Sequence, residues 1–227
     1  RQGVLDQVRG YGELVHPVDP VMPVNMNVVC MMNAKYVISP ASLPPDRFQQ
    51  VFADPAKKLI IYQYARALQR AWFVDSAFTA ASKTEMYATM NLPEWKPDVL
   101  AILNEPVPEG IASPDSSWVR VTSYGAHTIS LKAYASQPAL MVLSEVYYPA
   151  GWTATVDGAG TKIYRTNAVL RSIVVPAGEH DVKFVFEPES FRIGSTVTTA
   201  GWAFVLLLVA VGVFRDEKIR GLLGKRG

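Results

Sequence analysis

The chain is poor in charged residues. They make up 19% of its 227 positions, whereas hydrophobic residues make up 49% and the mean hydropathy is +0.12. So little charge, without any internal repeat, excludes a disordered chain, a collagen-like fibre and a coiled coil. The length is sufficient for one large domain or two small ones with a hydrophobic core.

Cysteine and histidine are also scarce. Cys30 is the single cysteine, so an intrachain disulfide is excluded. It lies in the apolar stretch NVVCMMNAKY, which indicates a buried, unreactive thiol. The three histidines, His16, His127 and His180, are isolated from one another, and we expect them on the surface or at loop ends. We therefore expect no metal ligands and no cofactor.

Common catalytic motifs are missing. The sequence has no glycine-rich phosphate loop, no paired-histidine zinc motif and no Gly-x-Ser-x-Gly nucleophile elbow, so no catalytic residue is assigned. A carbohydrate hydrolase is a third-ranked hypothesis, because glycosidases use a pair of carboxylates. The carboxylates available for such a pair are Glu145, Asp157, Glu187 and Glu189. Asp157 is explained by its place in a turn signal, and Glu187 and Glu189 lie just before an apolar run, so these residues argue against a hydrolase.

One long apolar run lies near the end of the chain. Residues 195–214 (STVTTAGWAFVLLLVAVGVF) contain no charge, and Arg215 follows them. A helix of 20 residues, at about 1.5 Å per residue, spans the roughly 30 Å hydrocarbon core of a bilayer. Trp202 suits the interfacial aromatic belt. The run predicts a transmembrane helix with the lipid bilayer as partner, and the alternative is a buried core helix.

The positive charge is concentrated in a short tail. Residues 215–227 hold five basic and two acidic residues, a net charge of +3, so the other 214 residues carry −1 of the overall +2. A basic tail of this kind leaves no nucleic-acid-binding surface in the main part of the chain. By the positive-inside rule, we expect a cytoplasmic tail and extracytoplasmic residues 1–194.

The N-terminal end gives no export signal. The sequence starts at Arg1, without a methionine or a signal peptide. We expect a C-terminal piece of a polytopic membrane protein, whose upstream transmembrane helices supply export and pack with this segment. The alternative is a tail-anchored cytoplasmic domain, which would move a +3 tail across the membrane in the unfavourable direction.

Residues 1–92 predict a small α+β subdomain. Residues 7–23 are loop-like, and residues 24–32 predict a short helix packed on a sheet. Phe48, Val51 and Phe52 have helical spacing, so residues 44–53 predict a helix. Ser82 and Glu85 form a capping box for a further helix, 82–90. Strands are predicted at 35–39, 58–64 and 71–74.

Two further segments are predicted before the transmembrane helix. Residues 93–116 form a proline-rich linker with one strand at 98–103. Residues 117–192 have short Val-, Thr-, Tyr- and Phe-rich stretches with turn signals about every ten residues, which predicts an immunoglobulin-like or jelly-roll-like all-β sandwich. Asp157-Gly158 is a strong hairpin signal. The predicted strands are 118–124, 127–134, 139–147, 152–156, 161–165, 168–175 and 181–187.

Residues 144–152 (SEVYYPAGW) are the densest polar and aromatic segment. Flat aromatic rings stack on the apolar face of a pyranose, and a carboxylate accepts hydrogen bonds from sugar hydroxyls, so the segment indicates glycan binding. In the alternative interpretation, Tyr147 and Trp152 belong to the sandwich core and Glu145 pairs with Arg165 or Arg171. The candidate glycan-binding residues are Glu145, Tyr147, Tyr148, Trp152 and Arg171.

These segments carry a family resemblance. The runs LSEVYYPAGWTATVDG and IYRTNAVLRSIVVPAGEHDVKFVFEPESFRIGS, followed by an apolar helix, resemble the C-terminal end of YfhO-like bacterial membrane proteins. The upstream runs MMNAKYVIS and LIIYQYARALQRAWFVDSAF resemble the preceding region of that family, so the resemblance covers residues 25–214. Ala150 is a departure, because the family usually joins the proline directly to the Gly-Trp pair.

The resemblance implies a role outside the cytoplasmic membrane. The family is similar to GT-C glycosyltransferases, which use polyprenyl-phosphate sugars to decorate envelope glycans. The resemblance places the catalytic acidic residue of that fold in an early extracytoplasmic loop, which nothing in this chain matches. We therefore expect a non-catalytic accessory module whose partners include a glycan or polyprenyl-linked sugar. The alternative is a structural or protein-interaction sandwich with a membrane anchor.

Overall fold

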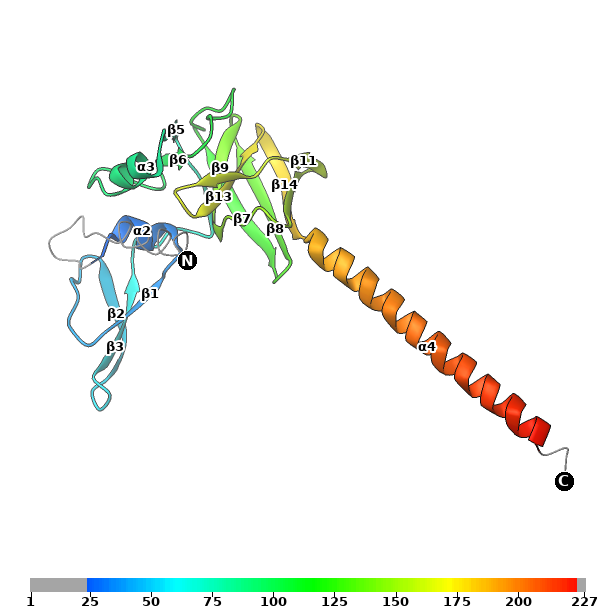
Figure 1. The fold of residues 1–227 in the computed structure, drawn as a ribbon. Helices are drawn as coiled ribbons and strands as arrows, with labels where there is room; N and C mark the ends of the chain where they lie inside the picture. Colours follow the sequence, from blue (N-terminus) through cyan, green and yellow to red (C-terminus); the bar gives the residue numbers. More distant parts are fainter. Residues whose placement is uncertain (1–23, 224–227) are drawn as a thin grey trace. The chain divides into compact units, whose positions relative to one another are not determined.

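The computed structural model describes residues 24–223, with side chains through residue 212. The loop-like stretch predicted at 7–23 and His16 lie outside the described residues. The chain divides into two compact units, one formed by Arg1–Pro149 with Thr153–Val185 and the other by Ala150–Trp152 with Phe186–Gly227. Among the described residues, the first unit holds three β-sheets and two short helices, and the second holds one long helix (Figure 1).

The first sheet is small and antiparallel. Its order is β1-β3-β2, formed by Tyr36–Ser39, Leu59–Tyr64 and Phe48–Asp54. Helix α2 (Met26–Met31) packs on one face of this sheet, as predicted, and its N-cap Asn25 accepts hydrogen bonds from the backbone N–H groups of Asn27 and Val28. The buried side chains in this layer are Met26, Cys30, Phe48, Tyr62 and Tyr64.

The helix predicted at 44–53 is wrong, because Phe48–Asp54 forms strand β2. Phe48 is buried against the ring of Tyr64 at a centroid distance of 5.1 Å. A β-bulge between Gln50 and Phe52 inserts one extra residue into the strand. A bulge shifts the strand alternation by one position, and this shift produced the apparent helical spacing.

Cys30 is buried, as predicted. Its side chain is 8% exposed, and its Sγ donates a hydrogen bond to the Arg66 carbonyl oxygen at 2.6 Å. Desolvation by burial raises the pKa of the thiol to about 11. The reactive thiolate is therefore scarce at neutral pH, so Cys30 is not a nucleophile.

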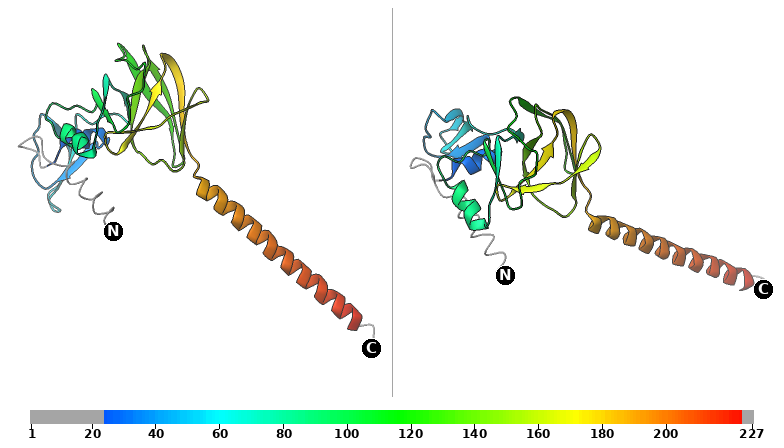
Figure 2. Two further views of the ribbon diagram at one scale, coloured as in Figure 1. Left: turned by 45° about the horizontal axis from the view of Figure 1, so that its top comes forward. Right: turned by 90° about the horizontal axis from the view of Figure 1, so that it is seen from above.

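Two larger sheets form a sandwich. The six-stranded sheet has the order β4-β9-β13-β12-β6-β5, and the five-stranded sheet has the order β11-β10-β14-β8-β7 (Figures 1 and 2). In this order, the strands of the six-stranded sheet are Ala71–Phe73, Ala139–Val146, Leu170–Val175, Tyr164–Thr166, Leu100–Leu103 and Ser76–Thr79. Those of the five-stranded sheet are Ala159–Thr161, Trp152–Val156, Gly178–Phe186, Thr128–Ala135 and Ser117–Tyr124. The predicted α+β start and β-sandwich are confirmed.

The six-stranded sheet draws its strands from distant parts of the chain. Strands β4 and β5 come from the segment predicted as a small subdomain, and β6 comes from the segment predicted as a linker. Only the pair β5 and β6 is parallel, and helix α3 (Lys83–Met90) lies between them in sequence. The sheet therefore crosses the predicted boundaries at 92 and 116, and the division into domains stays a prediction.

Helix α3 begins as the sequence predicts. The Ser82 hydroxyl accepts a hydrogen bond from the Glu85 N–H at 3.1 Å. The Glu85 carboxylate accepts one from the Ala81 N–H at 2.6 Å, one residue before the position of an ideal capping box. These two bonds satisfy free N–H groups at the helix start.

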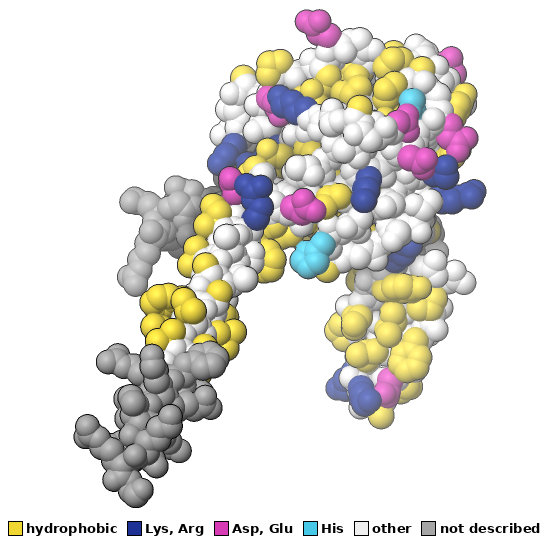
Figure 3. All heavy atoms as spheres, turned by 90° about the vertical axis from the view of Figure 1, so that its right-hand side faces the viewer, with side chains coloured by type: hydrophobic (Ala, Val, Ile, Leu, Met, Phe, Trp, Pro, Cys, Tyr) yellow, Lys and Arg dark blue, Asp and Glu magenta, His cyan; other side chains and the backbone are white. Residues whose placement is uncertain are grey.

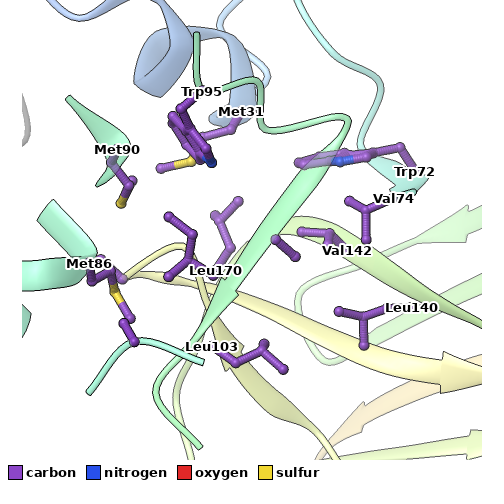
Figure 4. Packing of buried hydrophobic residues seen from close by; sticks show 14 residues of the cluster. Met31, Trp72, Val74, Met86, Met90, Trp95, Leu103, Leu140, Val142 and Leu170 are labelled. Carbon is purple, nitrogen blue, oxygen red and sulfur yellow. The ribbon is translucent and has the colours of Figure 1, made fainter. Parts of the chain in front are cut away.

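A hydrophobic cluster covers the six-stranded sheet. It packs the methionines of α2 and α3 and the indoles of Trp72 and Trp95 over aliphatic side chains of the sheet (Figure 4). The Trp72 Nε1 donates to the Pro97 carbonyl oxygen at 2.9 Å, and the Trp95 Nε1 donates to Leu100 at 3.0 Å. The helices and the loop before β6 are thus fixed on the sheet by both apolar and polar contacts.

The second unit is dominated by helix α4, Glu189–Leu223. Within its part Glu189–Gly212, an 18-residue stretch has a mean hydropathy of 1.8 and no buried residue, so the helix is long and apolar enough to cross a membrane. This confirms the predicted helix of membrane-span length, which the sequence placed at 195–214. Two residues separate it from the end of β14.

Candidate functional site

Glu145 lies near the end of β9 and connects the two sheets of the sandwich. Its Oε1 accepts a hydrogen bond from Arg70 Nη1 at 2.7 Å. Arg70 lies just before β4, a strand of the same sheet as β9. The Tyr124 hydroxyl donates to the same oxygen at 3.0 Å, and Tyr124 ends β7 of the five-stranded sheet. The Arg70 guanidinium also lies 4.1 Å from the centre of the Tyr124 ring. One carboxylate therefore connects strands from both sheets.

Arg171 contributes the second positive charge beside Glu145. It lies on β13 with only 3% of its surface exposed, and its Nη2 is 3.9 Å from Glu145 Oε2. Its guanidinium faces the Phe184 ring of the opposite sheet at 5.7 Å. Desolvation lowers the pKa of Arg171, and the charge of Glu145 opposes that shift. We call Arg70, Tyr124, Glu145 and Arg171 the Glu145 cluster.

The five predicted glycan contacts have different surroundings. Glu145 and Arg171 come together, which confirms the ion pair of the alternative interpretation, whereas the Arg165 Nε donates to the Ala168 carbonyl oxygen at 2.6 Å. Tyr147 is half-buried and Tyr148 is 54% exposed. Trp152 belongs to the second unit. Glycan contact by these five residues stays a prediction.

The second unit begins with a tight junction around Gly151. Its φ is +115°, and a Cβ built there would lie 2.8 Å from the Pro188 Cα. The Gly151 carbonyl oxygen accepts a hydrogen bond from the Glu187 N–H at 2.8 Å. The rings of Trp152 and Phe186 pack with their centroids 5.3 Å apart. These contacts fasten the residues before α4 to the start of β10.

A further aromatic surface lies on the outer side of the five-stranded sheet. Trp118 of β7 and Tyr134 of β8 are directly opposite each other, and their rings are stacked at 6.3 Å with an interplanar angle of 19°. Glu179 of β14 is the next cross-strand neighbour of Tyr134. Lys132 forms ion pairs with Asp181 at 3.2 Å and Glu179 at 3.8 Å. We call these five residues the aromatic face.

The sequence prediction missed the aromatic face, although strand alternation contains the signal. Ile129, Leu131, Ala133 and Ala135 of β8 are buried, so Tyr134 lies in the opposite phase. Trp118 is 42% exposed. Two neighbouring strands therefore each carry a large aromatic residue on the side that faces solvent, where polar residues are usual. Such residues mark a surface available for recognition.

His180 and Asp157 form a separate polar pair at the β10–β11 turn. The Asp157 carboxylate is 2.6 Å from His180 Nδ1 and accepts a hydrogen bond from the Asp181 N–H at 2.8 Å. Asp157 and Gly158 have φ values of +51° and +82°, so the predicted Asp-Gly hairpin is confirmed. The hydrogen bond to Asp157 raises the pKa of His180, and the bond from His180 lowers the pKa of Asp157.

We expect this turn to be most stable between about pH 4 and pH 6.5. Because the pKa of His180 is higher in the folded protein than in the unfolded one, protonated His180 stabilises the fold fully at a pH below the unfolded-state pKa. This contribution is lost as the pH rises through the folded-state pKa. The pKa of Asp157 is lower in the folded protein, so its ionised carboxylate stabilises the fold at a pH above the unfolded-state pKa. This contribution is lost as the pH falls through the folded-state pKa. Thermal unfolding from pH 4 to 9 should show a decline above neutrality that His180→Gln removes. An equal decline in both proteins would contradict the role of this pair.

Fold and surface together define a β-sandwich protein with a helix of membrane-span length. Among the side chains described, those of residues 24–212, no group of three or more His, Cys, Asp or Glu could hold a metal ion. Residues 107–198 match the family model described as bacterial membrane protein YfhO, which confirms the resemblance over this part of the chain. The resemblance of the upstream runs stays a prediction. No curated protein and no solved structure matches the chain.

Proposed function

We propose that this chain is the extracytoplasmic C-terminal module of a polytopic, glycosyltransferase-like envelope protein and holds an acceptor glycan near the membrane. The match to a bacterial membrane protein family and the apolar helix α4 support a membrane location. The +3 charge of residues 215–227 supports a cytoplasmic tail. A reporter fused after Gly227 should be active only in the cytoplasm, and activity only outside the cell would contradict this orientation.

The aromatic face is the observation that supports glycan binding. The near-parallel indole and phenol rings offer apolar surface against which a pyranose ring can pack, and the neighbouring Lys132, Glu179 and Asp181 can exchange hydrogen bonds with hydroxyl groups. The acidic and basic side chains of the aromatic face are close together, so this face suits an uncharged glycan better than a polyanion. Tyr147, Tyr148 and Trp152 remain part of the proposal as further contacts.

Isothermal titration of the full chain in detergent, with neutral oligosaccharides first selected on a glycan array, tests this proposal. Trp118→Ala should weaken binding about tenfold, the factor that corresponds to about 1.4 kcal/mol. Val99→Ala, at a residue just before β6 that is 38% exposed, is the matched control and should leave binding unchanged. Absence of sugar binding in the folded chain would contradict the proposal.

The Glu145 cluster favours a second candidate, a structural or protein-interaction module. Glu145 and Arg171 join the two sheets, so these members of the predicted glycan set already have partners within the fold. A purely structural module predicts no sugar binding, and Trp118→Ala and Trp152→Ala would then change only stability or partner assembly.

A further inference from the structure

The small β1-β3-β2 sheet has an exposed apolar face. In its antiparallel register, Ile38, Ile61 and Phe52 are directly opposite one another, and such residues lie on the same side of a sheet. Tyr36 lies two positions before Ile38, which places it on that side as well. The exposed fractions are 61% for Tyr36, 66% for Ile38 and 52% for Phe52. We call Tyr36, Ile38, Phe52 and Ile61 the apolar sheet face.

The opposite side of this sheet is already buried. Phe48, Tyr62 and Tyr64 pack there with Met26 and Cys30 of α2. The apolar sheet face is therefore not needed for the core of its own layer. Exposed aromatic and β-branched side chains that lie next to one another, on a face that is not part of the core, indicate an interaction surface.

Positive charge borders this face at the β2–β3 turn. Lys57 and Lys58 occupy the turn, whereas Asp54 is the single acidic residue there. The Asp54 side chain accepts hydrogen bonds from the N–H groups of Ala56 and Lys57 and lies 3.6 Å from Lys57 Nζ, so it is engaged in the turn. Figure 3 shows the lobe formed by this sheet, with hydrophobic side chains along it and basic and acidic side chains at its tip.

This combination fits the interface of an anionic bilayer. Isoleucine and phenylalanine enter the acyl boundary, tyrosine suits the headgroup level and lysine pairs with lipid phosphates. The chain also carries a helix of membrane-span length, and attachment to a bilayer raises the local concentration of lipid around the rest of the molecule. We propose that the apolar sheet face binds the surface of an anionic membrane, with the β2–β3 turn inserted at the headgroup level.

A fluorophore at the turn tests this contact in the full chain. Ala56 is exposed and can be changed to cysteine and labelled with an environment-sensitive dye, while the buried Cys30 stays unlabelled. The protein is reconstituted in vesicles of phosphatidylcholine with or without phosphatidylglycerol. In anionic vesicles we expect blue-shifted emission and at least twofold stronger quenching by spin-labelled lipid than for the same dye at Asp115→Cys, an exposed loop position.

Matched variants separate apolar contact from charge. Ile38→Ser with Phe52→Ser should reduce the quenching several-fold, whereas the control Val146→Ser should not. Lys57→Gln with Lys58→Gln, at side chains outside the core, should reduce it in anionic vesicles and abolish its sensitivity to salt. Circular dichroism checks that each variant is folded.

Two results would overturn the proposal. One is quenching at Ala56 no stronger than at Asp115 in the folded wild-type background. The other is cross-linking between Ala56→Cys positions of two copies without lipid quenching, which would assign the face to a second copy of this chain. Because neither readout involves sugar, the test is independent of the glycan proposal.

Discussion

Replacing Glu145 with leucine should lower the free energy of unfolding by about 3 kcal/mol or more. The change leaves the guanidinium of Arg171, which is 3% exposed, without the carboxylate beside it. It also removes the acceptor that Arg70 and Tyr124 share across the two sheets. Urea denaturation of the full chain in detergent, followed by tryptophan fluorescence, measures the loss.

A double variant distinguishes a buried charge from a general defect of packing. Glu145→Leu with Arg171→Met removes both charges, so we expect it to recover a large part of the lost stability. Arg70→Met should cost less than Glu145→Leu, because the Arg70 side chain is 36% exposed and water can replace part of its interaction. A double variant as unstable as Glu145→Leu alone would contradict this explanation.

Gly151→Ala should be the most damaging change at the junction before α4. Its φ of +115° favours glycine, and the new Cβ would lie 2.8–2.9 Å from three atoms of Pro188. Backbone strain of about 1–3 kcal/mol adds to a steric clash of similar size. We expect faster hydrogen exchange at the Glu187 N–H, because its bond to the Gly151 carbonyl oxygen would be disrupted.

Two other glycines of the chain serve as controls. Gly158 also has a positive φ, of +82°, but a Cβ there meets no atom within 4 Å, so Gly158→Ala tests backbone strain alone. Gly160 has open space around its Cβ position and no positive φ, so Gly160→Ala should be nearly neutral. If Gly151→Ala is no worse than Gly158→Ala, the contact with Pro188 is not important.

The predictable parts of this fold are those that depend on local sequence. The capping residues Ser82 and Glu85, the Asp157-Gly158 turn and the uncharged run before Arg215 each determine a local structure, and each appears where expected. Strand β2 was mistaken for a helix because its bulge disrupts the alternation. The short strand β5 was missed, because its partner β6 is about 24 residues away and local propensity does not report such pairing.

The site was only partly predictable for a related reason. The sequence indicated that Glu145 is important and named either Arg165 or Arg171 as its partner, but it could not reveal Arg70, 75 residues away. That Tyr147, Tyr148 and Trp152 contact a glycan together stays a prediction, because it rests on their closeness in sequence. The ring pair of Trp118 and Tyr134 depends on the strand register, which brings together residues from two separate strands.

The order of strands in the five-stranded sheet has a consequence for biogenesis. Strand β14 is the last strand in the chain, yet it lies in the middle of the sheet between β10 and β8. Before residue 186 has been synthesised, this sheet exists only as two separate hairpins. Helix α4 begins at Glu189, so the membrane helix follows the closing strand almost immediately during translation. The hydrogen bonds that join these two hairpins into one sheet therefore depend on the last strand before the helix of membrane-span length.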